Sequence, residues 1–206
     1  MKTDVIQISP TGAGITEALA ETEKAAAYRE LGPKQTLRLR LLAEEMTGML
    51  KTIIGKTKLC YWVESEGMSF SLHLAANTEV NETLRKELLK TSTTGKNAAA
   101  KGFMGRLCDI FTRFSESEAI PAVPSEFGYG FNYVDVTNFD ASLDISPNAM
   151  LYGWSLNVYR DAVAEHRREK QEQWDELERS ITAKLADEVK IFIRKNTVEM
   201  VIEKVF

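Results

Sequence analysis

Residues 37–54 read Leu-Arg-Leu-Arg-Leu-Leu-Ala-Glu-Glu-Met-Thr-Gly-Met-Leu-Lys-Thr-Ile-Ile. Apolar side chains recur in this stretch at steps of three and four residues, which places them on one face of a helix. The members of this stripe are Leu39, Leu42, Met46, Met49, Leu50 and Ile53. We therefore predict one amphipathic helix from about residue 34 to residue 54, which carries two adjacent carboxylates, Glu44 and Glu45, near its middle.

Strand-like segments lie on both sides of this helix. Residues 5–8 form a short strand candidate, and a turn containing glycine and proline leads from it into a predicted helix over 15–31. The Gly32-Pro33 pair is expected to end that helix. Residues 58–64 and 68–75 surround a short glycine-containing turn, and the second run alternates apolar and polar side chains. These two runs predict a hairpin with one buried face.

The middle of the chain has a looser pattern. Helices are predicted over 81–90 and 98–114, separated by a polar break. Residues 115–150 contain three of the five prolines and several aromatic side chains. We expect this segment to be a long excursion whose aromatic side chains pack on the domain or on another chain.

The last quarter of the chain is expected to form helix followed by a hairpin. Residues 151–188 are helical in character, with charges of both signs between 160 and 178. Residues 189–193 and 197–206 are rich in β-branched side chains and flank an asparagine turn, which predicts a terminal hairpin. Strands from both ends of the chain can then join one sheet.

Composition bounds the class of protein. The chain has 206 residues, 44% of them hydrophobic and 27% charged, which is typical of one sizeable globular domain spanning residues 1–206. Its formal net charge of −4 disfavours a general nucleic-acid binder. No apolar run approaches the roughly 20 residues of a membrane span. Cys60 and Cys108 lack CxxC spacing, so we expect two buried reduced thiols, no metal site, and a cytoplasmic protein. The alternative for the two cysteines is a disulfide or a metal pair.

The order of elements resembles the GHKL family of ATP-binding domains, which occurs in histidine kinases and in anti-sigma factor kinases. Residues 43–50, Ala-Glu-Glu-Met-Thr-Gly-Met-Leu, look like the N box on the second helix of that family. Residues 177–191 look like its last helix entering the final hairpin. The resemblance implies a two-layer α/β sandwich, with a mixed or antiparallel sheet and helices on one face. Residues 80–150 would then be an enlarged lid insertion.

The resemblance also implies candidate site residues. Glu44 matches the catalytic glutamate of the N box, but Gly48 stands where the family has the asparagine that binds Mg²⁺. The resemblance implies ATP as the cofactor. Because glycine offers no side-chain oxygen, the family's Mg²⁺ ligand is missing at this position. Asn77 lies where the family has the aspartate that recognises adenine. A plainer interpretation is that one of the two adjacent carboxylates pairs with Arg38 or Arg40 and the other faces solvent.

A second candidate site lies in the polar break at residues 91–97. Thr94, Gly95 and Lys96 precede a predicted helix that contains Lys101, and such a helix start with nearby cations can bind phosphate. The alternative is an ordinary N-cap and linker. The two histidines, at positions 73 and 166, have no partners at metal-ligand spacing and are expected to be structural.

Two functions remain open from the sequence. The first is a regulatory protein that binds an ATP-like nucleotide, with Glu44 near the γ-phosphate and no firm expectation of catalysis. The second is a non-catalytic protein-interaction module on the same fold that has lost nucleotide binding. A protein partner would then contact residues 115–150 or the charged helix at 160–178. No oligomeric state is predicted.

Overall fold

A computed structural model describes residues 1–48, 58–77, 131–133, 152–165, 168, 171–194 and 197–206. Its strands are β1 (Ile6–Ile8), β2 (Leu59–Glu66), β3 (Ser69–Asn77), β4 (Phe131–Tyr133), β5 (Tyr152–Ser155), β6 (Glu188–Arg194) and β7 (Thr197–Val205). Its helices are α1 (Ile15–Tyr28), α2 (Pro33–Gly48), α6 (Leu156–Glu165), α7 (Gln171–Arg179) and α8 (Ile181–Leu185). The predicted helices at 81–90 and 98–114, and the 80–150 insertion apart from β4, lie outside the described residues.

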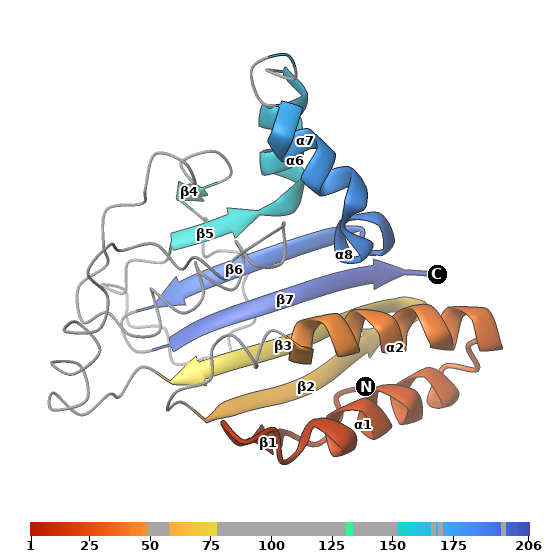
Figure 1. Ribbon diagram of the computed structural model, residues 1–206. Coiled ribbons are helices and arrows are strands. Elements are labelled where there is room, and N and C mark those ends of the chain that lie inside the picture. The colour runs from red at the N-terminus through yellow and green to blue at the C-terminus, as the bar shows by residue number, and fades with distance from the viewer. Residues whose placement is uncertain (49–57, 78–130, 134–151, 166–167, 169–170, 195–196) are drawn as a thin grey trace, which may run out of the picture.

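The seven strands form one sheet in the order β1-β2-β3-β7-β6-β5-β4. Every neighbouring pair is antiparallel. The N-terminal hairpin of β2 and β3 joins the C-terminal hairpin of β6 and β7 where β3 pairs with β7. Helices α1 and α2 lie on one face of the sheet (Figure 1). The predicted α/β fold, with strands from both chain ends in one sheet, is therefore confirmed.

The turn between β1 and α1 depends on Gly14. This residue has a φ of +97°, and a Cβ added to it would lie 2.4 Å from the backbone oxygen of Gln7. Only glycine permits both the left-handed conformation and this close approach. The first helix therefore folds directly back against β1 and β2. Its buried side chains are small, which allows close packing: Ala18, Thr22, Ala25 and Ala26.

Proline begins the second helix and does not end the first. Helix α1 stops at Tyr28, and Glu30 adopts a φ of +56° in the connection. Pro33 then occupies the first turn of α2, where its missing N–H costs no hydrogen bond. The side chain of Gln35 accepts a hydrogen bond of 3.0 Å from the Gly32 N–H, as in a capping box. The predicted end of the first helix at residue 31 is thus three residues too late.

The predicted buried stripe of α2 is confirmed over its described part. Leu39, Leu42 and Met46 are fully buried, and residues 49–57 lie outside the described part of the chain. The hairpin of β2 and β3 supplies the opposite side of this core, because alternate residues face the helices. The fully buried sheet side chains on this face are Ile8, Leu59, Tyr61, Phe70, Leu72, Leu74, Ala76, Val189, Ile191, Met200 and Ile202.

The prediction of helix from residue 151 onward is wrong at its start. Residues 152–155 form β5, which pairs with β6 and carries β4 on its other side. The helical part is also divided into α6, α7 and α8. Ser180 separates the last two, because its hydroxyl caps α8 by accepting a 3.1 Å hydrogen bond from the Ala183 N–H. The predicted terminal hairpin of β6 and β7 is confirmed.

Candidate functional site

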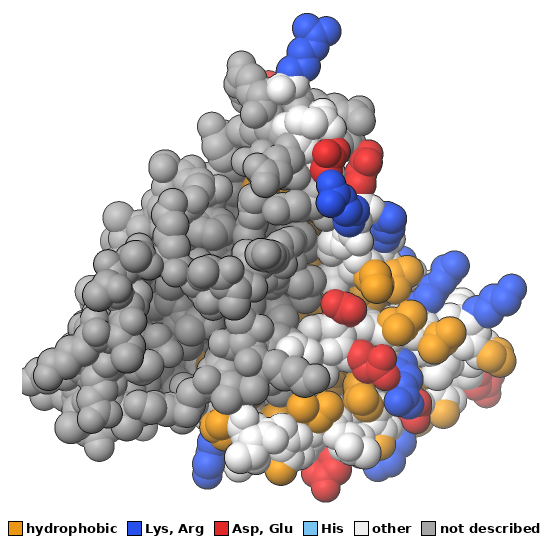
Figure 2. Space-filling view, in the orientation of Figure 1, with side chains coloured by type: hydrophobic (Ala, Val, Ile, Leu, Met, Phe, Trp, Pro, Cys, Tyr) orange, Lys and Arg blue, Asp and Glu red, His pale blue; other side chains and the backbone are white. Residues whose placement is uncertain are grey.

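Glu44 of α2 belongs to a chain of ion pairs. Arg40 donates from Nε to Glu44 Oε1 at 2.9 Å, and its guanidinium also pairs with Glu23 of α1. The Glu44 side chain is 41% exposed. The hydrogen bond to Glu23, followed by the one to Glu44, raises the pKa of Arg40. Acidic and basic side chains likewise lie side by side over the helical layer (Figure 2). The prediction that Arg40 pairs with one of the two carboxylates is confirmed.

The glycine four residues beyond Glu44 leaves open space beside the helix. Gly48 is the last residue of α2 and is exposed. Among the described residues, no atom lies within 4 Å of a Cβ added to it. A Cβ at this position is therefore accommodated by the described part of the chain.

The other predicted site residues are less fully described. Asn77 is the last residue of β3 and stands opposite Thr197 in the register of β3 and β7. Helix α2 and strand β3 run in the same direction and end toward the same side of the molecule (Figure 1). Thr94, Gly95, Lys96 and Lys101 lie outside the described residues.

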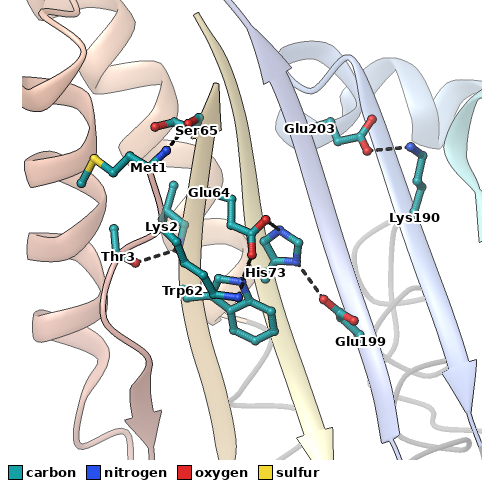
Figure 3. Close-up of polar contacts among 11 residues, drawn as sticks. Met1, Lys2, Thr3, Trp62, Glu64, Ser65, His73, Lys190, Glu199 and Glu203 are labelled. Carbon is teal, nitrogen blue, oxygen red and sulfur yellow. Dashed lines mark hydrogen bonds and ion pairs between the residues drawn. The ribbon is translucent and has the colours of Figure 1, made fainter. Parts of the chain in front are cut away.

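A second polar group occupies the face of the sheet opposite α1. The hydroxyl of Tyr61 contacts Thr22 of α1, so the neighbouring side chains of β2 point to the other face. There, three adjacent strands contribute Glu64, His73 and Glu199 (Figure 3). Nδ1 of His73 lies 2.8 Å from Oε1 of Glu199, and Nε2 lies 3.9 Å from Oε2 of Glu64.

The imidazole ring of His73 also stacks on Trp62. The two residues are direct partners in the register of β2 and β3, and their ring centroids are 4.7 Å apart at an interplanar angle of 9°. The Nζ of Lys2 lies 5.0 Å from the centroid of the Trp62 ring. The stack fixes the plane of the imidazole, in which Nδ1 faces Glu199 and Nε2 faces Glu64.

Burial distinguishes the two carboxylates beside the ring. The side chain of Glu199 is 7% exposed, that of His73 is 14% exposed and that of Glu64 is 35% exposed. Burial raises the pKa of Glu64, but hydrogen bonds from Lys2 and Trp62 and the charge of His73 outweigh it, so the net pKa is lowered. Glu64 therefore stays ionised at neutral pH.

An open hollow adjoins this group at the turn end of the hairpin. It has a volume of about 930 Å³, and Glu64 forms part of its wall. Its other lining residues are mostly polar: Met1, Lys2, Arg29, Ser65, Glu66, Ser69 and Ser71. Arg29 is already engaged there, because it donates to the carbonyl and hydroxyl oxygens of Ser65 at 2.6 and 3.0 Å.

Sequence alone predicts a structural role for His73 and does not indicate its partners. The alternation of β3 and the turn at Gly67 were sufficient to place His73 opposite Trp62. The pairing with Glu199 spans 126 residues and depends on β3 and β7 becoming neighbours, which no local pattern indicates. A histidine on the polar face of a predicted strand was the available signal.

The described part of the chain contains neither a metal-binding cluster nor a membrane-spanning helix. Within the described residues, no group of three or more His, Cys, Asp or Glu side chains is arranged to hold a metal ion. None of the described helices is long and apolar enough to cross a membrane. Cys60 is a half-buried free thiol, while Cys108 lies outside the described part. Comparison with protein-family models, curated proteins and solved structures finds no match to this chain.

Proposed function

We propose that this chain is a regulatory protein that binds an ATP-like nucleotide beside the ends of α2 and β3. The order of elements carries the proposal. Two helices precede the β2–β3 hairpin, and a helical segment leads into the β6–β7 hairpin of the same sheet. This is the order on which the resemblance to the GHKL family rests. The helix with the N-box-like residues lies against the sheet, through contacts with β3.

Phosphoryl transfer is not part of this proposal. Glu44 Oε1 already accepts a hydrogen bond from Arg40 at 2.9 Å, so a reacting group would have to compete with the guanidinium for this carboxylate. Gly48 supplies no oxygen for a metal ion. A protein with these two features is better suited to sensing a nucleotide than to cleaving one.

The second candidate function is a protein-interaction module without a ligand. The observation that favours it is the ion-pair chain from Glu23 through Arg40 to Glu44, which gives Glu44 a role in joining α1 to α2. In this view the acidic residue remains because it holds two helices together. The partner surface would lie on residues 115–150, or on the helical segment 160–178.

Ligand-induced stabilisation separates the two functions. Calorimetry or thermal shift is measured with Mg-ATP, with ATP and EDTA, with ADP, and with inorganic triphosphate as a charge control. A ligand at ten times its Kd stabilises by about 1.4 kcal/mol, which raises the melting temperature of a chain of this size by roughly 3–6 °C. We expect ATP to stabilise equally with and without Mg²⁺. No stabilisation by millimolar nucleotide would rule out the first function.

Two lysine variants then test the phosphate assignment. Lys96→Ala is expected to abolish most of the stabilisation by ATP, because it removes a cation from the proposed phosphate-binding segment. Lys34→Ala is the matched control, since it removes the same charge from an exposed position at the start of α2. Equal ATP binding by both variants would remove residues 91–97 from the proposed site.

A further inference from the structure

The row of Glu64, His73 and Glu199 joins parts of the chain that are far apart in sequence. β2 and β3 belong to the N-terminal hairpin, and β7 is the last strand. His73 stands on the strand between the two carboxylates, with one ring nitrogen directed at each (Figure 3). A single imidazole therefore faces acceptors on both neighbouring strands.

With one proton, the ring can serve only one of these acceptors. When Nδ1 carries that proton, it donates to Glu199 Oε1 across 2.8 Å. Nε2 is then a lone pair that faces the Glu64 carboxylate. Neither atom has a proton to share, and their separation of 3.9 Å exceeds hydrogen-bond distance. Consistently, Nε2 is buried and has no hydrogen-bond partner within the described part of the chain.

We propose that the row is a pH-sensitive switch in which a second proton on His73 lets Nε2 donate to Glu64 Oε2, so that one imidazolium links β2 and β7 through β3. The neutral ring donates a hydrogen bond to Glu199 and none to Glu64. The charged ring makes charge-assisted hydrogen bonds to both carboxylates. Closing the second bond draws Glu64 Oε2 toward the ring from 3.9 Å.

The charged groups around the ring favour this reading. On β2, Glu64 is ionised, and its other oxygen, Oε1, accepts from Trp62 Nε1 and Lys2 Nζ, each at 2.9 Å. Oε2 is therefore the oxygen that remains for the ring. On β7 and β6, Glu203 and Lys190 pair with each other at 2.6 Å and balance their own charges. Among the described residues, the charge facing the ring is thus negative on both sides.

The switch has an optical consequence at Trp62. The indole lies flat against the imidazole at a centroid distance of 4.7 Å. A proton on the ring places a cation against the face of the indole and strengthens the contact. Because an imidazolium quenches a stacked indole, acidification should lower the fluorescence of Trp62.

Imidazole NMR tests the proposal directly. The chain has only two histidines, so His73→Gln assigns the signals of His73 and leaves His166 as an internal reference. In the wild-type protein we expect the Nε2 signal of His73 to change on acidification together with the fluorescence of Trp62. Both changes should be absent from His73→Gln. A His73 ring that keeps one proton throughout the folded range would overturn the proposal.

A second pair of variants tests the coupling to Glu64 in proteins that keep the histidine. Glu64→Gln removes the charge from a partly exposed position and leaves the bond between His73 and Glu199 intact. We expect the changes in the Nε2 signal and in Trp62 fluorescence to need a lower pH in this variant than in the wild-type protein, because the attraction of one carboxylate is lost. Glu17→Gln removes the same charge from an exposed position on α1, which lies on the other face of the sheet, and should leave these changes at the same pH as in the wild-type protein. Identical titration in Glu64→Gln and wild-type protein would also overturn the proposal.

Discussion

The hydroxyl groups of Tyr61 and Thr22 lie 2.6 Å apart inside the core, and their hydrogen bond joins β2 to α1. Both residues are almost completely buried. Thr22 donates its single hydroxyl proton to the carbonyl oxygen of Ala18, 2.9 Å away. Tyr61 must therefore be the donor in the shared bond. The hydroxyl of Tyr61 depends on Thr22, whereas the donor proton of Thr22 is satisfied within its own helix.

This direction of donation predicts unequal costs for removing the two partners. Tyr61→Phe deletes one donor and leaves Thr22 bonded to its helix, so we expect a loss of about 1 kcal/mol in unfolding free energy. Thr22→Val leaves the phenolic hydroxyl buried without an acceptor, which should cost about 1–3 kcal/mol. Urea unfolding of both variants measures the difference. A smaller loss in Thr22→Val than in Tyr61→Phe would contradict the assignment.

The same tyrosine predicts a loss of stability in alkali. Burial raises the pKa of Tyr61 well above its ordinary value. The unfolded chain therefore ionises first, and this contribution to stability falls as pH rises above about 10. Tyr61→Phe should lose less stability than the wild-type protein between neutral pH and alkaline pH. Parallel loss in the two proteins, measured by urea midpoints, would show that Tyr61 does not titrate on unfolding.

The elements that sequence patterns predicted are those whose cause is local. The β2–β3 hairpin has strict alternation on β3, and Gly67 adopts a φ of +55° at the first of two turn positions. Strand β5 lacks such a cause, because its four residues lie beside helix-forming sequence. It becomes a strand by pairing with β6, as Trp154 does with Ile191. Local periodicity therefore could not identify it.

The candidate sites divide in the same way. The pairing of Arg40 with Glu44 follows from their spacing of four residues on one helix, so it is predictable from the sequence. The row that includes His73 and Glu199 requires the order of strands in the sheet, which brings β7 beside β3. A polar site built across strands is visible only after the sheet is assembled.

A substitution at Gly48 tests the metal ligand that the proposed nucleotide site lacks. Among the described residues, no atom lies within 4 Å of a Cβ there, so Gly48→Asn should fold. We expect Mg²⁺ to increase the stabilisation by ATP in this variant, because asparagine supplies a ligand oxygen. Gly48→Ala is the matched control, since it gains up to about 1 kcal/mol of helix stability and no ligand. An equal response of the two variants to Mg-ATP would count against a metal position beside α2.

Gly14 and Gly67 predict a graded response to alanine. Both have positive φ, but only at Gly14 would the new Cβ collide with backbone, 2.4 Å from the carbonyl oxygen of Gln7. Gly14→Ala should cost more than about 2 kcal/mol, since strain and collision add. Gly67→Ala should cost about 1 kcal/mol of unfolding free energy, because the new Cβ collides with no described atom and only the strain of the positive φ remains. Comparable unfolding free energies for the two variants would contradict the tight β1–α1 turn.

The carboxylate of Asp187 predicts an acid-dependent contribution at the junction of α8 and β6. It accepts from Lys204 Nζ at 2.8 Å and from the Val205 N–H at 2.6 Å. Burial raises the pKa of Asp187, but these hydrogen bonds and the charge of Lys204 outweigh it, so the pKa is lowered. The unfolded chain therefore takes up the proton first. The stability from this group is present above the ordinary pKa of aspartate and is lost as pH falls through the lowered value.

Asp187→Asn measures that contribution. Because the side chain is 47% exposed, solvent screening limits the expected loss at pH 7 to about 0.5–1 kcal/mol. The difference from the wild-type protein should disappear in acid, once the pH has fallen through the lowered pKa of Asp187 and both chains are neutral at this position. Asp175→Asn is the control, since its carboxylate faces Arg179 at 3.8 Å on an exposed helix and should have little effect at either pH. Urea midpoints at both pH values give the comparison, and a difference that persists in acid would assign the loss to packing and not to charge.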